Sequence, residues 1–369
     1  MPEFSSMTPD PLPPDSVRID LPPHDDTGAV APHRRADFSR RATGLPTMAA
    51  VARLAGVSLK TVSRVVNGEA AVRPETAARV RVAWKELGYR RNDAASTLAR
   101  AQAPAGIGLI IEDISDPFYS RLTRGVQEVA RAHGHFVMLS SSEENSELER
   151  STVLALTSRG IAGLIVVPHS DDQHYLEPEI ESGLSVVFVD RPPQGLVADS
   201  VMSNNIEGSR LAVKHLLDLG HRRIAFVGND RSVYTSTQRL RGYRKAHTVA
   251  GVTTDEERLV VLGPRTEAEA GAATSALLGS PNPPTAVFAQ NNLLTTGAWR
   301  AIRESGTPVA LVGFDDFALA DVLDPPVTVV AQDPMTLGRK AAELLFSRLA
   351  DATGPVQRII VPTRLIVRG

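Results

Sequence analysis

From residue 107 onwards, short apolar runs alternate with longer segments in which apolar residues recur every three or four positions. The runs IGLII, FVMLSS, IAGLIVVP and SVVFVD are typical of buried strands, and the segments between them are typical of amphipathic helices. The runs RRIAFVGN, RLVVL, TAVFAQN and VALVGFDD continue the pattern. This alternation predicts parallel β-sheets that are covered by helices on both faces.

Two predicted helices in this region are similar in sequence. Residues 120–134 and 237–251 are both 15 residues long, both have Arg-Gly at their fifth and sixth positions, and both end in Gly. Each follows a predicted strand and a loop. Two such units predict two similar subdomains with a cleft between them. A chance similarity between two amphipathic helices is the alternative.

The N-terminal part of the chain has a helical pattern only. Residues 47–55 have the apolar spacing of a short helix that Thr47 caps and Gly56 ends. A second short helix follows the N-cap Ser58, and a third begins at Pro74, a residue that suits the first helical turn. The pattern predicts helix, tight glycine turn, helix, loop and helix.

Composition changes this picture at the N-terminus. Residues 1–46 are rich in Pro, Asp and Ser and cannot bury enough apolar surface to fold, so we expect a disordered tail. A regulatory arm and a start-site artefact both remain open for it. The other residues suit a soluble protein of two or three domains, since 42% of the 369 residues are hydrophobic and 22% are charged.

Charge is concentrated in the three-helix segment. Residues 47–100 carry a net charge of +6, whereas the whole chain carries −2, so the remainder carries −8. A compact basic module on an acidic body indicates a polyanionic partner for that module.

The second short helix has a polar outer face. Leu59, Lys60 and Arg64 share that face, where Arg64 suits guanine and Lys60 suits a base or a phosphate. The short donors Ser58, Thr61 and Ser63 suit phosphates. In a helix-turn-helix the second helix enters the major groove of DNA. An ordinary helical bundle with a solvated basic face is the alternative.

The motifs TMAAVARLAGVSLKTVSRVVNG and VRPETAARVRVAWKELGYRRNDAASTLAR closely resemble the headpiece of the lactose/galactose repressor (LacI/GalR) family. The resemblance continues through DPFYSRLTRGVQEVARAHG, EGSRLAVKHLLDLGHRRIAFVG and VPTRLIVRG. It implies a cytoplasmic, homodimeric, effector-responsive regulator of bacterial transcription, most often a repressor. Its partners would be double-stranded operator DNA and a small-molecule effector.

The resemblance also implies the fold. We expect an all-α helix-turn-helix headpiece and an α/β core of two parallel-sheet subdomains, like a type I periplasmic binding protein. The expected domains are a tail (1–46), a headpiece (47–91), a hinge helix and linker (92–104) and a core (105–369). Within the core we expect subdomain one at about 105–203 and 335–360, and subdomain two at about 204–332 and 361–369.

The segment NDAASTLA matches the family's hinge, which forms a helix on operator DNA and inserts a leucine into the minor groove. The resemblance therefore makes Leu98 the wedge and Ala95 the close contact. Packing of Leu98 in an ordinary linker helix is the alternative. The complete set of candidate DNA-binding residues is Thr47, Ser58, Leu59, Lys60, Thr61, Ser63, Arg64, Asn67, Tyr89, Asn92, Ala95 and Leu98.

The family binds its effector between the subdomains, at the carboxyl ends of the strands. By resemblance the effector-binding residues are Ser115, Phe118, Asp190, Thr235, Arg239, Asn291, Asp315 and Gln332. Arg239 and Asp315 suit vicinal hydroxyls or an anionic group. A structural salt bridge for Arg239 and a helix N-cap role for Asp315 are the alternatives. A sugar is the expected effector, and a nucleoside or a phosphorylated metabolite stays open.

Other function classes find little support. The chain has no cysteine, no run of about 18 apolar residues, and no Walker, dinucleotide or GxSxG motif. We therefore expect no enzyme activity, no cofactor, no metal and no membrane association. The alternatives are a solute-binding protein without a DNA function and an α/β enzyme whose catalytic residues the sequence does not reveal.

Overall fold

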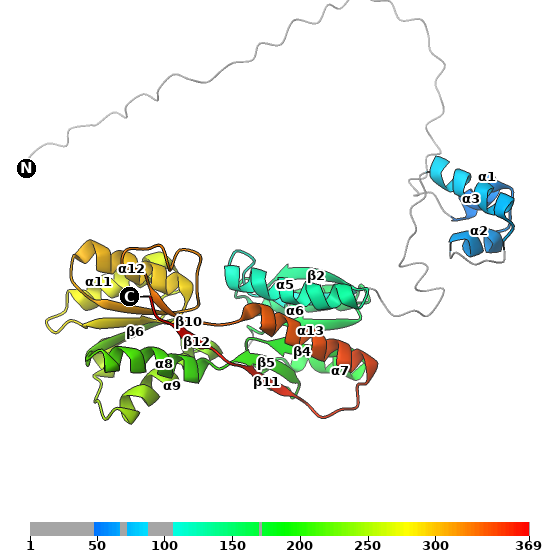
Figure 1. Cartoon of the computed structure of the whole chain (residues 1–369). Coiled ribbons are helices and arrows are strands. Elements are labelled where there is room, and N and C mark those ends of the chain that lie inside the picture. The colour runs from blue at the N-terminus through cyan, green and yellow to red at the C-terminus, as the bar shows by residue number, and fades with distance from the viewer. Residues whose placement is uncertain (1–47, 67–71, 88–105, 170–171, 369) are drawn as a thin grey trace, which may run out of the picture. The chain divides into compact units, whose positions relative to one another are not determined.

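A computed structural model describes residues 48–66, 72–87, 106–169 and 172–368 of the chain (Figure 1). These residues belong to two compact units that divide between Asn92 and Asp93. The first unit contains three helices, and the second contains two sheets with their covering helices.

The helices of the first unit are α1 (Met48–Ala55), α2 (Leu59–Val66) and α3 (Pro74–Glu86). They pack around a small core of aliphatic residues, namely Val51, Ala52, Ala55, Val62, Val80 and Ala83. Ser58 precedes α2 and caps it as predicted, because the Thr61 N–H donates to Ser58 Oγ at 3.1 Å. The helix-turn-helix pattern is therefore present.

The second unit contains two six-stranded sheets whose strand orders correspond. The first sheet has, in spatial order, β11 (Arg358–Val361), β5 (Asp199–Ser203), β4 (Ser185–Val189), β3 (Gly163–Val166), β1 (Gly106–Ile111) and β2 (Phe136–Ser141), all parallel. The second has β12 (Arg364–Ile366), β10 (Thr328–Ala331), β9 (Ala310–Phe314), β8 (Ala286–Ala289), β6 (Ile224–Gly228) and β7 (Val260–Leu262). In the second sheet only β12 is antiparallel to its neighbour.

Helices cover both faces of each sheet. On the first sheet, α5 (Pro117–Ala132) and α13 (Pro334–Ala350) cover one face, and α6 (Ser146–Thr157), η1 (His174–Leu176) and α7 (Glu177–Glu181) cover the other. On the second sheet, α8 (Asn205–Asp218) and α9 (Tyr234–Val249) lie opposite α11 (Glu267–Leu278) and α12 (Asn292–Ser305), and the short α10 (Glu256–Leu259) leads into β7. The predicted α/β core of two parallel-sheet subdomains is confirmed, and the two halves form the two lobes of Figure 1.

The sequence similarity between the two helices has a structural cause. The sixth residue of each segment is Gly125 in α5 and Gly242 in α9. A Cβ on Gly125 would lie 2.2 Å from the Met335 carbonyl oxygen of α13, and one on Gly242 would lie 2.3 Å from the Ile206 oxygen of α8. Each subdomain therefore needs glycine where its paired helices touch backbone to backbone.

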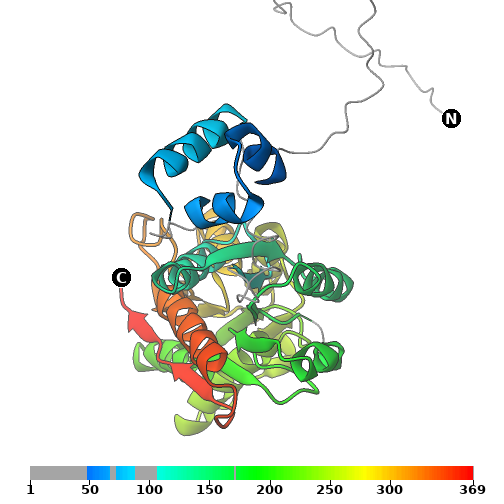
Figure 2. The ribbon, with the colours of Figure 1, turned by 90° about the vertical axis from the view of Figure 1, so that its right-hand side faces the viewer.

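The described chain passes between the subdomains at three places. The connections run from β5 to α8, from β10 to α13 and from β11 to β12. In Figure 1 the C-terminal segment, drawn in red, runs from β11 in one lobe to β12 in the other, and Figure 2 shows the same segment from the side. β11 ends at Val361, one residue beyond the expected change of subdomain at 360.

Candidate functional site

The exposed face of α2 carries the side chains that the sequence analysis assigned to DNA. Lys60 and Arg64 are exposed, and Leu59 is 54% exposed although it is apolar. On the opposite side Val62 is fully buried. The helix thus presents one polar, basic surface and holds its position through the other.

The hydroxyls of α2 are partly engaged within the helix. The Ser58 and Thr61 hydroxyls are 2.9 Å apart and share a hydrogen bond. Ser63 is half-buried. The remaining candidates for DNA contact lie outside the described residues, namely Thr47, Asn67, Tyr89, Asn92, Ala95 and Leu98.

A cavity of about 90 Å³ lies between the two subdomains, and we call it the inner chamber. Seven of the eight predicted effector residues line it, namely Phe118, Asp190, Thr235, Arg239, Asn291, Asp315 and Gln332. Ser115 does not. Its N–H and hydroxyl both donate to the Asp113 carboxylate at 2.8 Å, and this turn keeps Ser115 on the exposed surface.

Arg239 lines the inner chamber and makes several contacts there. It is 4% exposed, and its guanidinium donates to Asn205 Oδ1 at 2.8 Å and to the Gln290 carbonyl at 2.6 Å. It also lies 3.6 Å from Asp315 Oδ2 and stacks on the Phe314 ring at 3.9 Å. Arg239 therefore has a structural role, as the alternative interpretation proposed, since these contacts stabilise subdomain two. They also hold one edge of the guanidinium rigidly at the chamber.

The alternative for Asp315 is wrong, because no helix begins at this residue. Gln332 instead donates to Asp315 Oδ1 at 2.5 Å. Burial raises the pKa of Asp315 to about 6, and the nearby carboxylates Asp116 and Asp190 act in the same direction, while Arg239 and Gln332 oppose the shift. Burial likewise raises the pKa of Asp190 and of Asp116. Three carboxyl groups thus lie in a poorly solvated space, where Arg239 faces Asp315 and Arg191 lies 3.7 Å from Asp190 Oδ2.

The sequence analysis missed a second buried arginine. Arg191 is 7% exposed, donates from Nη2 to the Glu112 carboxylate, and contacts the Pro168 carbonyl at 3.4 Å. The Tyr119 hydroxyl also donates to Glu112, at 2.5 Å. Burial raises the pKa of Glu112, but the charge and the hydrogen bond of Arg191 outweigh it and leave that pKa below its ordinary value. The position of Arg191 directly after Asp190 was the available signal.

Two polar contacts cross the cleft and close the inner chamber. The Asn292 side-chain amide, on α12, donates to Asp116 Oδ1 of subdomain one at 3.2 Å. Arg265 Nη1 lies 3.1 Å from Glu144 Oε2. Both pairs join residues of different subdomains, so opening of the cleft breaks them.

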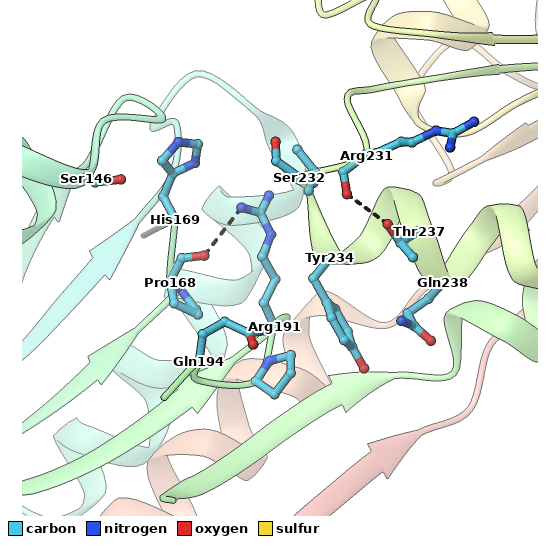
Figure 3. A pocket seen from close by; sticks show the side chains of 12 residues that line it. Ser146, Pro168, His169, Arg191, Gln194, Arg231, Ser232, Tyr234, Thr237 and Gln238 are labelled. Carbon is cyan, nitrogen blue, oxygen red and sulfur yellow. Dashed lines mark hydrogen bonds between the residues drawn. The ribbon is translucent and has the colours of Figure 1, made fainter. Parts of the chain in front are cut away.

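A larger cavity of about 350 Å³ adjoins the inner chamber, and we call it the outer chamber (Figure 3). Subdomain one contributes Pro168, His169, Arg191 and Gln194 to its wall, and subdomain two contributes Ser232 and Tyr234. Arg191 lines both chambers. None of the outer-chamber residues was assigned a role from the sequence.

The described residues contain no helix that is long and apolar enough to cross a membrane. Within the same residues, no group of three or more His, Asp or Glu is placed to hold a metal ion.

Two family models match the chain. The model described as bacterial regulatory proteins, lacI family, matches residues 47–92, and a periplasmic binding protein-like domain matches residues 213–369. The HTH-type transcriptional regulator CelR of Thermobifida fusca is 35% identical over 335 residues, which cover 88% of this chain and 97% of CelR.

Solved structures agree with the sequence matches. A transcriptional regulator CelR–cellobiose complex superposes with a TM-score of 0.64 at 33% identity and covers 88% of this chain and 99% of that one. A lac repressor dimer bound to operator and the anti-inducer ONPF superposes with a TM-score of 0.76 at 29% identity and covers 87% of this chain and 98% of that one.

Proposed function

This chain belongs to the LacI family of bacterial regulatory proteins, and on that basis we propose that it represses transcription under the control of a sugar bound in its core. It is a DNA-binding transcriptional regulator. Its homologues are regulators of transcription rather than enzymes, and we assign it no catalytic activity. Because its target is chromosomal DNA, we place it in the cytoplasm.

The observation that carries the DNA function is the exposed face of α2. Lys60 and Arg64 are exposed on a short helix whose opposite side, at Val62, is fully buried. A slender helix of this kind fits the major groove, where an arginine forks onto guanine and shorter polar groups contact phosphates. The lac repressor relative was solved as a dimer on its operator, which supports a homodimer on a pseudo-palindromic site here.

The hinge belongs to the same proposal. In our assignment the headpiece spans 47–91, the hinge and linker span 92–104, and the core follows from 105. Leu98 would enter the minor groove at a central base step and bend the duplex. Asn92 and Ala95 would place the hinge helix against the DNA backbone and against its symmetry mate.

The inner chamber is our proposed effector site. The buried side chains of Asp190 and Arg239 and the half-buried side chains of Asp315 and Gln332 offer acceptors and donors in this cavity. Such a constellation suits a polyhydroxylated ligand, since each hydroxyl both donates and accepts. The relative CelR was solved with cellobiose, which supports a sugar as the ligand. Binding would change the angle between the subdomains and so bias the hinge.

A selection experiment tests the proposed function. Sheared genomic DNA is incubated with the full-length protein at about 0.1 M salt, with and without a panel of sugars, and bound fragments are sequenced. We expect a small set of fragments that share an inverted repeat, with an affinity that one sugar changes. Recovery of random fragments under every condition would refute the assignment.

A further inference from the structure

A further cavity lies in subdomain two, at the end of its sheet that is remote from the effector site. It has a volume of about 210 Å³, and we call it the basal cavity. It lies at the amino ends of β9 and β10, between the last turns of α8 and α12. Asp315 of the inner chamber follows the opposite end of β9, about 16 Å along an extended strand of five residues. The basal cavity is therefore separate from the cleft between the subdomains.

The wall of the basal cavity is mostly apolar. Leu216 and Ile302 contribute from the two helices, and Val312 and Val327 contribute from β9 and from the loop before β10. All four of these side chains are buried. A dry apolar cavity of about 150 Å³ holds benzene, so one of about 210 Å³ accommodates a six-membered ring with a short substituent.

One hydrogen-bond donor in this wall has no partner. The indole Nε1 of Trp299 is buried, and the described residues supply no acceptor for it. The Thr328 hydroxyl oxygen already accepts from the Arg368 N–H at 3.0 Å, so it adds a donor rather than a free acceptor. A buried indole N–H usually has a partner, and a water molecule needs two to four polar neighbours. The basal cavity therefore favours an apolar ligand that carries an acceptor.

The rim of the basal cavity is basic. Arg303 is exposed there, its guanidinium lies 6.0 Å from the centre of the Trp299 ring, and it forms no ion pair within the described part of the chain. His215 is the other ionisable residue of the wall, and no described carboxylate lines it. Three acids that are adjacent in sequence to wall residues are exposed and do not line the cavity, namely Asp218, Glu304 and Asp324. An acceptor at the rim is therefore favoured further if it is an anion.

We propose that the basal cavity is a second ligand site, and that it binds a small aromatic monocarboxylate. The ring occupies the apolar interior beside the Trp299 indole. The carboxylate lies towards the rim, where it accepts from Trp299 Nε1 and pairs with Arg303. A single delocalised charge suits this position, because a phosphate dianion would lose more hydration against apolar walls. The proposed regulatory function does not use this cavity.

The test compares four probes on the full-length protein by calorimetric titration. Benzoate and phenylacetate carry both a ring and a carboxylate, benzyl alcohol carries the ring alone, and acetate carries the charge alone. We expect benzoate or phenylacetate to bind with a Kd of about 1 mM or below, and at least about tenfold more tightly than benzyl alcohol or acetate.

Tryptophan fluorescence locates the bound probe. The chain has two tryptophans, Trp84 in the headpiece and Trp299 at the basal cavity. In Trp84→Phe the remaining emission comes from Trp299 alone. The carboxylate that binds should change this emission with the same Kd as in the titration.

Two variants separate the ring contact from the polar contacts. Trp299→Phe keeps an aromatic wall but removes the donor, and Arg303→Gln removes the charge. Each should weaken carboxylate binding about tenfold and leave the binding of benzyl alcohol unchanged. Arg300→Gln is the matched control on the same helix, because Arg300 pairs with Glu267 at 3.1 Å and does not line the cavity.

Several outcomes would overturn the inference. They are failure of both carboxylates to bind, equally tight binding of benzyl alcohol or acetate, and constant emission in Trp84→Phe. Unchanged carboxylate binding in Trp299→Phe or in Arg303→Gln would place the probe elsewhere, and an equal loss in Arg300→Gln would show a non-specific attraction to positive charge. Operator selection and the sugar response are measured separately, so each of these outcomes leaves the proposed function intact.

Discussion

Asp190 and Asp315 are structural counterparts in the two subdomains. Each follows a parallel strand, β4 or β9, and each has a left-handed backbone, with φ of 68° and 71°. Each backbone N–H donates at 2.9 Å to the next strand, at the Val201 and Val330 carbonyls. A left-handed φ is unfavourable for residues other than glycine, and such strain clusters at ligand sites. The two halves thus place the same strained carboxylate in the inner chamber.

The first prediction concerns Asp315 and pH. Its pKa of about 6 exceeds the ordinary 3.8, so the folded protein binds more protons than the unfolded chain between these values. Stability should therefore fall as pH rises through this window, by on the order of 2–3 kcal/mol. Asp315→Asn should flatten that part of the profile, as measured by urea unfolding at several pH values. The exposed Asp321→Asn is the control. An unchanged slope in Asp315→Asn would show that another group titrates.

The second prediction concerns Arg239. Arg239→Lys keeps the charge but loses the forked contacts with Asn205 and Gln290. We expect the free energy of unfolding to fall by about 1.5–3 kcal/mol for each charged hydrogen bond that is lost. We also expect the sugar-induced thermal shift to disappear. DNA binding should persist. Lys245→Ala, on the exposed side of α9, should alter neither property. A normal sugar response in Arg239→Lys would remove Arg239 from the effector site.

The third prediction concerns base recognition by α2. Arg64→Ala should reduce the preference for operator over random duplex by about 1–3 kcal/mol, because a bidentate contact with one base is lost. Competitive mobility-shift assays at fixed salt give this ratio. Arg79→Ala, on the exposed side of α3, should leave the ratio intact. An equal loss of specific and non-specific binding in Arg64→Ala would indicate a phosphate contact instead.

The fourth prediction concerns the hinge. Leu98→Ala should weaken binding to the operator by on the order of tenfold, because the base step is no longer wedged open. Binding to random duplex should change little, since that depends on phosphates. Permuted-fragment electrophoresis should also show a smaller bend. Full operator affinity with an unchanged bend would assign Leu98 to the packing of an ordinary linker helix.

The fifth prediction concerns helix contacts. A Cβ on Gly338 of α13 would lie 2.1 Å from the Leu122 carbonyl oxygen of α5, and backbone atoms cannot give way as a side chain does. Gly338→Ala should therefore lower the free energy of unfolding by about 1–3 kcal/mol. Gly271→Ala on α11 meets nothing closer than 3.4 Å and should raise it by up to about 1 kcal/mol. Equal effects in chemical denaturation would contradict the close contact.

Much of the fold followed from local patterns. Apolar runs and helical spacing predicted the alternation of strands and helices, since parallel strands are buried on both faces. The repeated Arg-Gly pair predicted two similar subdomains, and Gly125 and Gly242 mark equivalent helix contacts. The local patterns could not predict that β11 joins the first sheet and β12 the second, because strand pairing over long sequence separations leaves no local periodicity.

The effector site was predicted through family resemblance, and the residues that this prediction missed or misplaced have physical explanations. Seven residues at the carboxyl ends of strands and at helix starts lie together, as the crevice rule leads one to expect. Ser115 lies apart because its hydroxyl is satisfied by Asp113, a turn contact that spacing does not reveal. The Arg191–Glu112 ion pair was not predicted, because the two residues are far apart in the sequence.

The three connections between the subdomains have a mechanical consequence. Because three chain segments join the subdomains, we expect rotation about these connections to be the easiest relative motion, and sliding or twisting to be resisted. Ligands of different shape should then differ in the angle at which they hold the two subdomains, and this angle should vary gradually from one ligand to the next. A collection of sugar analogues should accordingly rank in the same order by cleft opening, measured by scattering or spin-label distances, and by operator release.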